Sequence, residues 1–169
     1  MPEALIALGA NLGKPVEALC SAVKAIEEAN GIRLLGVSRF YTTSPVDSSG
    51  PDYVNAVVRV ETTLDPMALL HVCQAIENAH GRVRPAGVVN APRTLDLDVL
   101  AYEGVVSGDP VLTLPHPRMH ERLFVLVPLS DLLPQWRLAD GRAVCEAVRD
   151  VRETHPDQLI RPLMSENMA

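Results

Sequence analysis

Two aspartates lie two residues apart in a short apolar run. Asp96 and Asp98 alternate with leucine and valine within residues 94–102, and this alternation predicts a strand whose two carboxylates leave the same face. Aspartate is uncommon inside strands, and neighbouring carboxylates repel each other unless a cation or hydrogen-bond donors compensate them. Mg²⁺ prefers hard oxygen ligands and completes its shell with water and substrate phosphates. The pair therefore indicates either a magnesium site or an acidic strand face exposed to solvent.

Arginines surround this acidic pair in the sequence. Arg82, Arg84 and Arg93 lie in the segment before the strand, and Arg118 and Arg122 follow the next extended segment. Guanidinium groups bind phosphate oxygens through paired hydrogen bonds. Surface ion pairs are the alternative for each arginine, but five arginines around two carboxylates favour a site for a metal ion and a polyphosphate.

Other polar side chains are candidates for the same site. Gln74 and Glu77 are three residues apart on a predicted helix, so they either reach the site together or form a surface pair. Asn55, close to Tyr53, is the one amide in a predicted apolar strand; it either braces the core or binds the edge of a heterocycle. His116 lies between two prolines, which hold it in an extended segment.

The elements that must position these residues follow from the hydrophobic pattern. Predicted strands cover residues 3–9, 32–43, 53–63 and 94–102, predicted helices cover 15–30, 65–80, 123–133 and 140–151, and residues 110–117 form a predicted extended loop. Asp65 and Asp140 are the predicted N-caps of their helices. This order predicts an α+β ferredoxin-like sandwich, in which helices pack on an antiparallel sheet and a helical extension follows at the C-terminus.

Composition narrows the class of protein. The 169 residues carry 15 Lys and Arg against 21 Asp and Glu, a net charge of −6, and 47% of them are hydrophobic. These values exclude a disordered or fibrous chain and disfavour nucleic acid as a partner. The three cysteines are too sparse for a disulfide framework or a zinc site. We expect one domain over residues 1–169, a cytoplasmic monomer with no membrane segment.

A phosphate-binding loop of the Walker type is missing, because no Gly-Lys-Ser or Gly-Lys-Thr follows the glycine-rich turn at residues 9–13. Side chains and metal ions must therefore bind any phosphate. The segments that carry the candidate residues resemble one known family over nearly the whole chain. The strongest is APRTLDLDVL at residues 91–100, supported by LGANLG at 8–13, FYTTSPV at 40–46, PDYVNAVV at 51–58 and LPHPRMHERLFVLVPL at 114–129.

The family that these segments resemble is the 6-hydroxymethyl-7,8-dihydropterin pyrophosphokinases of folate biosynthesis. The resemblance implies the ferredoxin-like fold and the transfer of pyrophosphate from ATP to the pterin hydroxymethyl group, with release of AMP. ATP and the hydroxymethyldihydropterin would be the partners. Two Mg²⁺ ions would be bound by Asp96 and Asp98.

The resemblance also implies a role for each matching position. Arg82 and Arg93 would act in catalysis together with the two aspartates. The nucleotide would contact Gln74, Glu77, Arg84, Val99, Thr113, His116 and Arg122. The pterin would contact Thr43, Pro45, Val46, Tyr53, Asn55 and Phe124.

Three other functions are compatible with such a scaffold. A ligand-binding module without catalysis would not require both aspartates. A metal-dependent phosphohydrolase would release phosphate from ATP without an acceptor. RNA binding is disfavoured by the net charge of −6 and by the absence of an aromatic-rich strand signature.

Overall fold

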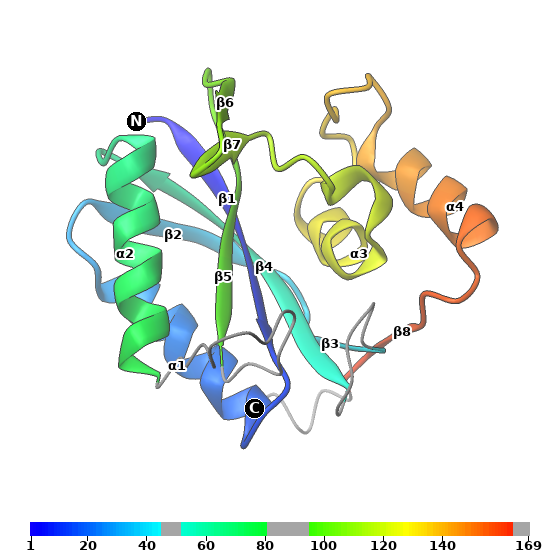
Figure 1. Ribbon diagram of the computed structural model, residues 1–169, viewed down its shortest axis with the longest axis horizontal. Helices are drawn as coiled ribbons and strands as arrows, with labels where there is room; N and C mark the ends of the chain where they lie inside the picture. Colours follow the sequence, from blue (N-terminus) through cyan, green and yellow to red (C-terminus); the bar gives the residue numbers. More distant parts are fainter. Residues whose placement is uncertain (45–51, 81–94, 164–169) are drawn as a thin grey trace.

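An antiparallel sheet lies between two layers of helices in the computed structural model, which describes residues 1–44, 52–80 and 95–163 (Figure 1). The strand order is β5-β1-β4-β3-β8, and β2 also pairs with β4. The sheet strands are β1 Glu3–Ala10, β2 Ile32–Val37, β3 Tyr41–Thr43, β4 Tyr53–Thr62, β5 Asp96–Tyr102 and β8 Ile160–Pro162. A separate hairpin pairs β6 Ser107–Asp109 with β7 Leu112–Leu114.

Two amphipathic helices, α1 Pro15–Glu28 and α2 Pro66–Ala79, cover one face of the sheet. Leu19 and Ile26 of α1 and Leu69 of α2 are fully buried against strand residues such as Ile6 and Val58. Each helix has its apolar residues on one stripe, because the opposite side faces water. This confirms the helices expected on this face of the sheet.

The other face is covered by α3 Leu123–Leu132, with α4 Val144–Thr154 packed outside it. Leu126 and Leu129 are fully buried in the cluster that contains Leu5, Val57 and Leu100 of the sheet. Since α3 lies between the sheet and α4, it is apolar on more than one side. A short 3₁₀ turn, η1 Met119–Glu121, precedes it.

The C-terminal end of α3 is tied to β3 by one carboxylate. Asp131 accepts hydrogen bonds from the Tyr41 hydroxyl at 2.7 Å and from the Arg39 amide at 3.1 Å. The Arg39 guanidinium also pairs with Asp131 at 3.2 Å. Burial, followed by the hydrogen bond to Asp131, raises the pKa of Tyr41 to about 12. The hydroxyl therefore stays protonated and keeps donating.

Four expectations differ from the structure. The segment 32–43 is not one strand, because the chain leaves the sheet pattern at Ser38, whose Oγ accepts from the Val57 amide at 2.9 Å. The expected loop at 110–117 includes β7 of the hairpin, and β8 was not predicted. Asp140 does not cap α4: that helix begins after Ala143, and Asp140 accepts instead from the amide and guanidinium of Arg142.

The other predicted cap agrees with the structure, whereas the packing of the cysteines in the core is found for Cys73 and not for Cys20. The Asp65 Oδ1 atom accepts from the Ala68 amide at 2.8 Å at the start of α2. All three cysteines are free; Cys73 is buried, whereas Cys20 is exposed. Among the described residues, no helix is long and apolar enough to cross a membrane.

Replacing the α2 cap tests how this helix begins. Asp65→Ala leaves the Ala68 amide without its acceptor, and we expect the free energy of unfolding to fall by about 1 kcal/mol. Urea denaturation followed by circular dichroism measures this loss. Asp65→Asn is the matched control, because asparagine caps helices about as well as aspartate. Equal stability of Asp65→Ala and the wild type would contradict the capping role.

Candidate active site

A cavity of about 420 Å³ opens on the α3 side of the sheet, beyond the start of that helix. Residues of β1, β3, β4 and β5, the beginning of α3 and the segment after α4 line it. Its lining residues are Ala7, Leu8, Gly9, Thr43, Ser44, Tyr53, Asn55, Asp96, Asp98, Arg118, Glu121, Arg122, Phe124, His155, Asp157 and Gln158. A volume of this size is typical of a small-molecule site.

One sheet face changes from apolar to polar where α3 stops covering it. On β5, Leu100 is buried in the α3 cluster, whereas Asp98 and Asp96, on the same face, line the cavity. On β4, Val57 is buried in that cluster and Asn55 lines the cavity. The period of two along each strand therefore places both kinds of residue on one surface.

A close approach of two strands fixes Asn55. Gly9 on β1 is opposite Asn55 on one side and Asp96 on the other. A Cβ atom at Gly9 would lie 2.8 Å from the Asn55 side-chain nitrogen, so only glycine leaves room for the amide. The Asn55 Oδ1 atom accepts from the Thr43 hydroxyl at 2.6 Å. Sequence reasoning missed this role of Gly9, although a glycine ending an apolar strand was the signal.

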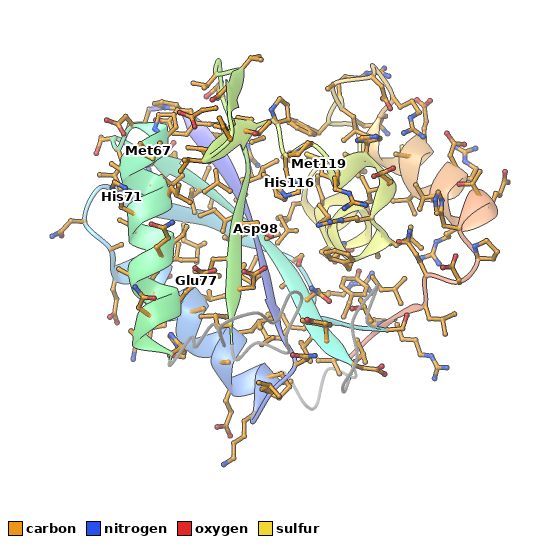
Figure 2. All side chains as sticks on the ribbon, in the orientation of Figure 1. Met67, His71, Glu77, Asp98, His116 and Met119 are labelled. Atoms are coloured by element: carbon orange, nitrogen blue, oxygen red, sulfur yellow. The ribbon has the colours of Figure 1, made fainter. Side chains whose placement is uncertain are left out.

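The backbone between the two aspartates is held from α2. Glu77, which is 5% exposed, accepts a hydrogen bond from the Leu97 amide at 2.7 Å. In Figure 2, Glu77 on α2 and His116 are drawn on opposite sides of Asp98. Burial, Glu77 and Asp98 together raise the pKa of the Cys73 thiol to about 12. The acidic pair thus lies in a region of concentrated negative charge.

Positive charge faces this region from the start of α3. The Arg122 guanidinium lies 5.4 Å from the centre of the Phe124 ring. Burial and the neighbouring Arg118 lower its pKa, while Asp98, Glu121 and Asp96 act in the opposite direction. Arg118 pairs with Glu121 at 3.5 Å. A polyanion in the cavity would therefore meet a half-buried cation.

The cavity brings together eight of the residues expected from the sequence: Thr43, Tyr53, Asn55, Asp96, Asp98, Arg118, Arg122 and Phe124. Five others lie outside its lining. Gln74 is exposed on α2, Val99 is buried in the α1–α2 cluster, and Glu77 holds the β5 backbone. The Thr113 hydroxyl donates to the Asp109 carbonyl, and the His116 amide donates to the Leu100 carbonyl. Pro45, Val46, Arg82, Arg84 and Arg93 lie outside the described residues.

The acidic pair matches a metal ion that needs few protein ligands. Within residues 1–44, 52–80 and 95–163, no group of three or more His, Cys, Asp or Glu side chains could hold a metal ion. Mg²⁺ is commonly bound by one or two carboxylates, with water and substrate phosphates as its remaining ligands. Two half-buried carboxylates beside a cavity with arginines fit that pattern.

Comparisons with known proteins agree with each other. A family model described as 7,8-dihydro-6-hydroxymethylpterin-pyrophosphokinase matches residues 5–134. The 2-amino-4-hydroxy-6-hydroxymethyldihydropteridine pyrophosphokinase of Haemophilus influenzae is 43% identical over 150 residues, which cover 88% of this chain and 92% of that protein. The Pseudomonas aeruginosa protein of the same name is 43% identical over 142 residues, 83% of this chain and 86% of that one.

Solved structures share the fold at lower identity. An HPPK-DHPS chain crystallised with substrates has a TM-score of 0.71 and 13% identity, and the match covers 92% of this chain and 44% of that one. A Plasmodium falciparum HPPK-DHPS chain has a TM-score of 0.72 and 14% identity, covering 92% and 47%. This chain therefore spans less than half the length of those chains. At this low sequence identity, the structural similarity shows a shared fold and nothing more.

The charge balance around His116 can be measured directly. Burial first, and then Arg122, lower its pKa from 6.5, while Asp96 raises it. We expect Asp96→Asn to lower the His116 pKa further, because it removes a charge that favours the imidazolium. NMR titration of the ring measures this shift; an unchanged or higher pKa in the variant would contradict the arrangement. The pKa of His116 is lower in the folded protein than in the unfolded chain, so the unfolded chain binds the proton more readily. The contribution of neutral His116 to the free energy of unfolding is therefore complete above pH 6.5 and is lost as the pH falls toward the pKa of the folded protein.

Proposed function

The chain belongs to the 7,8-dihydro-6-hydroxymethylpterin-pyrophosphokinase family. We propose which of its residues bind the pterin, which bind the nucleotide and which bind the metal ions. The protein is an enzyme of folate biosynthesis that transfers pyrophosphate from ATP to 6-hydroxymethyl-7,8-dihydropterin and releases AMP. The observation that carries the assignment of residues is that the acidic pair and the aromatic side chains line one cavity.

The pterin binds at the end of the cavity where β3, β4 and α3 meet. Phe124 and Tyr53 line this end, and their rings contact the two faces of the flat heterocycle. Asn55, whose oxygen already accepts from Thr43, directs its amide toward the ring edge. The other expected pterin contacts, Pro45 and Val46, lie outside the described residues.

The triphosphate binds at the other end, beside β5. Asp96 and Asp98 would hold the Mg²⁺ ions, whose chemistry when bound would be to neutralise phosphate charge and to orient the substrates. Glu77 keeps the backbone of this pair in place through the Leu97 amide. Arg122 adds a cation from the residue before α3, and its half-buried position strengthens its attraction for phosphate.

Further nucleotide contacts are assigned to residues outside the cavity lining. Gln74, Val99, Thr113 and His116 contact the nucleotide, with Val99 contributing through its backbone because its side chain is buried. Arg82 and Arg93, assisted by Arg84, stabilise charge on the transferred group; all three lie outside the described residues. Residues 1–169 form a single pyrophosphokinase domain that acts as a monomer in the cytoplasm.

Product analysis tests the reaction and the acidic pair together. With ATP, Mg²⁺ and 6-hydroxymethyl-7,8-dihydropterin, we expect pterin-dependent AMP, resolved by chromatography. Asp98→Asn should lower kcat by roughly 100-fold or more, the scale of losing one group that stabilises transition-state charge. Asp150→Asn is the matched control, because Asp150 lies on α4 and pairs with Arg142.

Each alternative function gives a different product in this assay. ADP or phosphate without the pterin would indicate a phosphohydrolase, and binding without turnover would indicate a binding module. Wild-type turnover in Asp98→Asn would exclude the proposed metal ligand.

The aromatic wall is tested by truncating Phe124. Phe124→Ala should weaken binding of the dihydropterin by about 2 kcal/mol, or about thirtyfold in Kd, because a buried ring contact is lost. Separate calorimetric titrations with the pterin and with a non-hydrolysable ATP analogue measure both affinities. Phe124→Leu, which keeps apolar bulk but not the flat ring, should be intermediate. A larger loss for the nucleotide than for the pterin would contradict the assignment.

A further inference from the structure

One side chain near the C-terminus joins two pieces of backbone at the cavity wall. The Gln158 Oε1 atom accepts from the Leu123 amide at 2.9 Å, and its Nε2 atom donates to the Glu121 carbonyl at 2.9 Å. These two backbone groups flank Arg122. A single carboxamide therefore bridges the last carbonyl of η1 and the first amide of α3.

The backbone at this junction needs an outside partner. Arg122 has extended dihedral angles, φ −119° and ψ 112°, and among the described residues its side chain caps no amide of α3. The first amides of a helix have no partner within the helix. Pro128, inside α3, has no amide hydrogen to donate to the Phe124 carbonyl four residues earlier. The Val125 and Leu126 amides donate to the Arg122 carbonyl at 3.1 and 2.9 Å, and Gln158 supplies the acceptor for the Leu123 amide before them.

The junction carries two side chains of the candidate site. Arg122 and Phe124 both line the cavity, and the guanidinium lies 5.4 Å from the ring centre. Any rotation of the backbone at Arg122 would move the cation and the ring together. Gln158 controls this backbone on both sides of Arg122, so it influences the nucleotide and pterin ends at once.

Gln158 is itself anchored to the opposite wall. The next residues form β8, where Ile160 pairs with Thr43 of β3. Before that strand, the Ser44 amide donates to the Leu159 carbonyl at 3.2 Å. The Gln158 amide donates to the His155 carbonyl at 3.1 Å. Residues 158–162 thus connect the β3 wall of the cavity to the α3 wall, and they lie beyond residue 134, where the family match ends.

We propose that Gln158 is a positioning residue for this enzyme, which sets the orientation of Arg122 and Phe124 through the backbone between η1 and α3. The inference rests on the proposed function in one respect: Arg122 and Phe124 are taken as the nucleotide and pterin contacts. The hydrogen bonds of Gln158 to the backbone do not depend on that assignment.

Two variants separate the two hydrogen bonds. Gln158→Leu keeps the approximate bulk and removes both bonds. Gln158→Glu keeps an acceptor for the Leu123 amide but removes the donor that faces the Glu121 carbonyl. Asp65→Ala is the matched control, because it also removes one acceptor from the start of a helix, and Asp65 does not line the cavity.

Four readouts are measured for each protein: Kd for the dihydropterin, Kd for a non-hydrolysable ATP analogue, amide hydrogen exchange at Leu123, and thermal stability. For Gln158→Leu we expect both Kd values to rise about tenfold and Leu123 exchange to accelerate at least about tenfold, the scale of losing one or two neutral hydrogen bonds. For Gln158→Glu, Leu123 exchange should stay near the wild-type rate and the Kd values should be intermediate. Asp65→Ala should change thermal stability only.

The outcomes are distinct. If Gln158→Leu lowers thermal stability as Asp65→Ala does but leaves both Kd values unchanged, Gln158 is only a structural residue and the inference is overturned. Unchanged Leu123 exchange would overturn it as well. If the wild type forms no AMP from ATP and the dihydropterin, the proposed reaction fails, and Leu123 exchange in Gln158→Leu still decides whether Gln158 holds this backbone.

Discussion

The alternation of side chains along a strand is the constraint on which the rest of the structure depends. Consecutive residues of β5 leave opposite faces, so Leu97 enters the α1–α2 core while Asp96 and Asp98 face the cavity. A shift of one residue in the pairing of β5 with β1 would bury both carboxylates and expose leucine. The hydrophobic core thus fixes the register, and the register fixes the acidic pair. The chemistry of the site is positioned by residues that never contact a substrate.

The helix α3 turns this arrangement into a cavity because it covers only part of one sheet face. It is held at its C-terminal end by Asp131, which bonds to Tyr41 and Arg39 of the β3 region. At its N-terminal end, Gln158 bonds to the backbone on both sides of Arg122. A helix fixed at both ends places its first residues against open sheet with little freedom. The aromatic and cationic walls of the cavity follow from these two contacts.

Local sequence patterns predicted much of the fold and part of the candidate site. The alternation around Asp96 and Asp98 and the cap at Asp65 were readable from neighbours a few residues away, and both agree with the structure. The break between β2 and β3 could not be predicted from neighbouring residues. It depends on a hydrogen bond between Ser38 and Val57, which lies 19 residues further along the chain. β8 is three residues long and contains a proline, so it has no periodic pattern, and its partner β3 lies far earlier in the sequence. Gln158 was missed for the same reason: its partners belong to another element.

The contact between Glu77 and Leu97 has a consequence for how copies of the chain meet. β5 is an outer strand of the sheet, and an outer strand normally offers a row of unpaired amides to which another chain can add. Near the start of β5, the Leu97 amide already donates to the buried Glu77 carboxylate. An incoming strand that paired at Leu97 would have to displace this buried hydrogen bond, which costs free energy. The side chain that holds the acidic residues in place therefore also protects this edge against strand addition and aggregation.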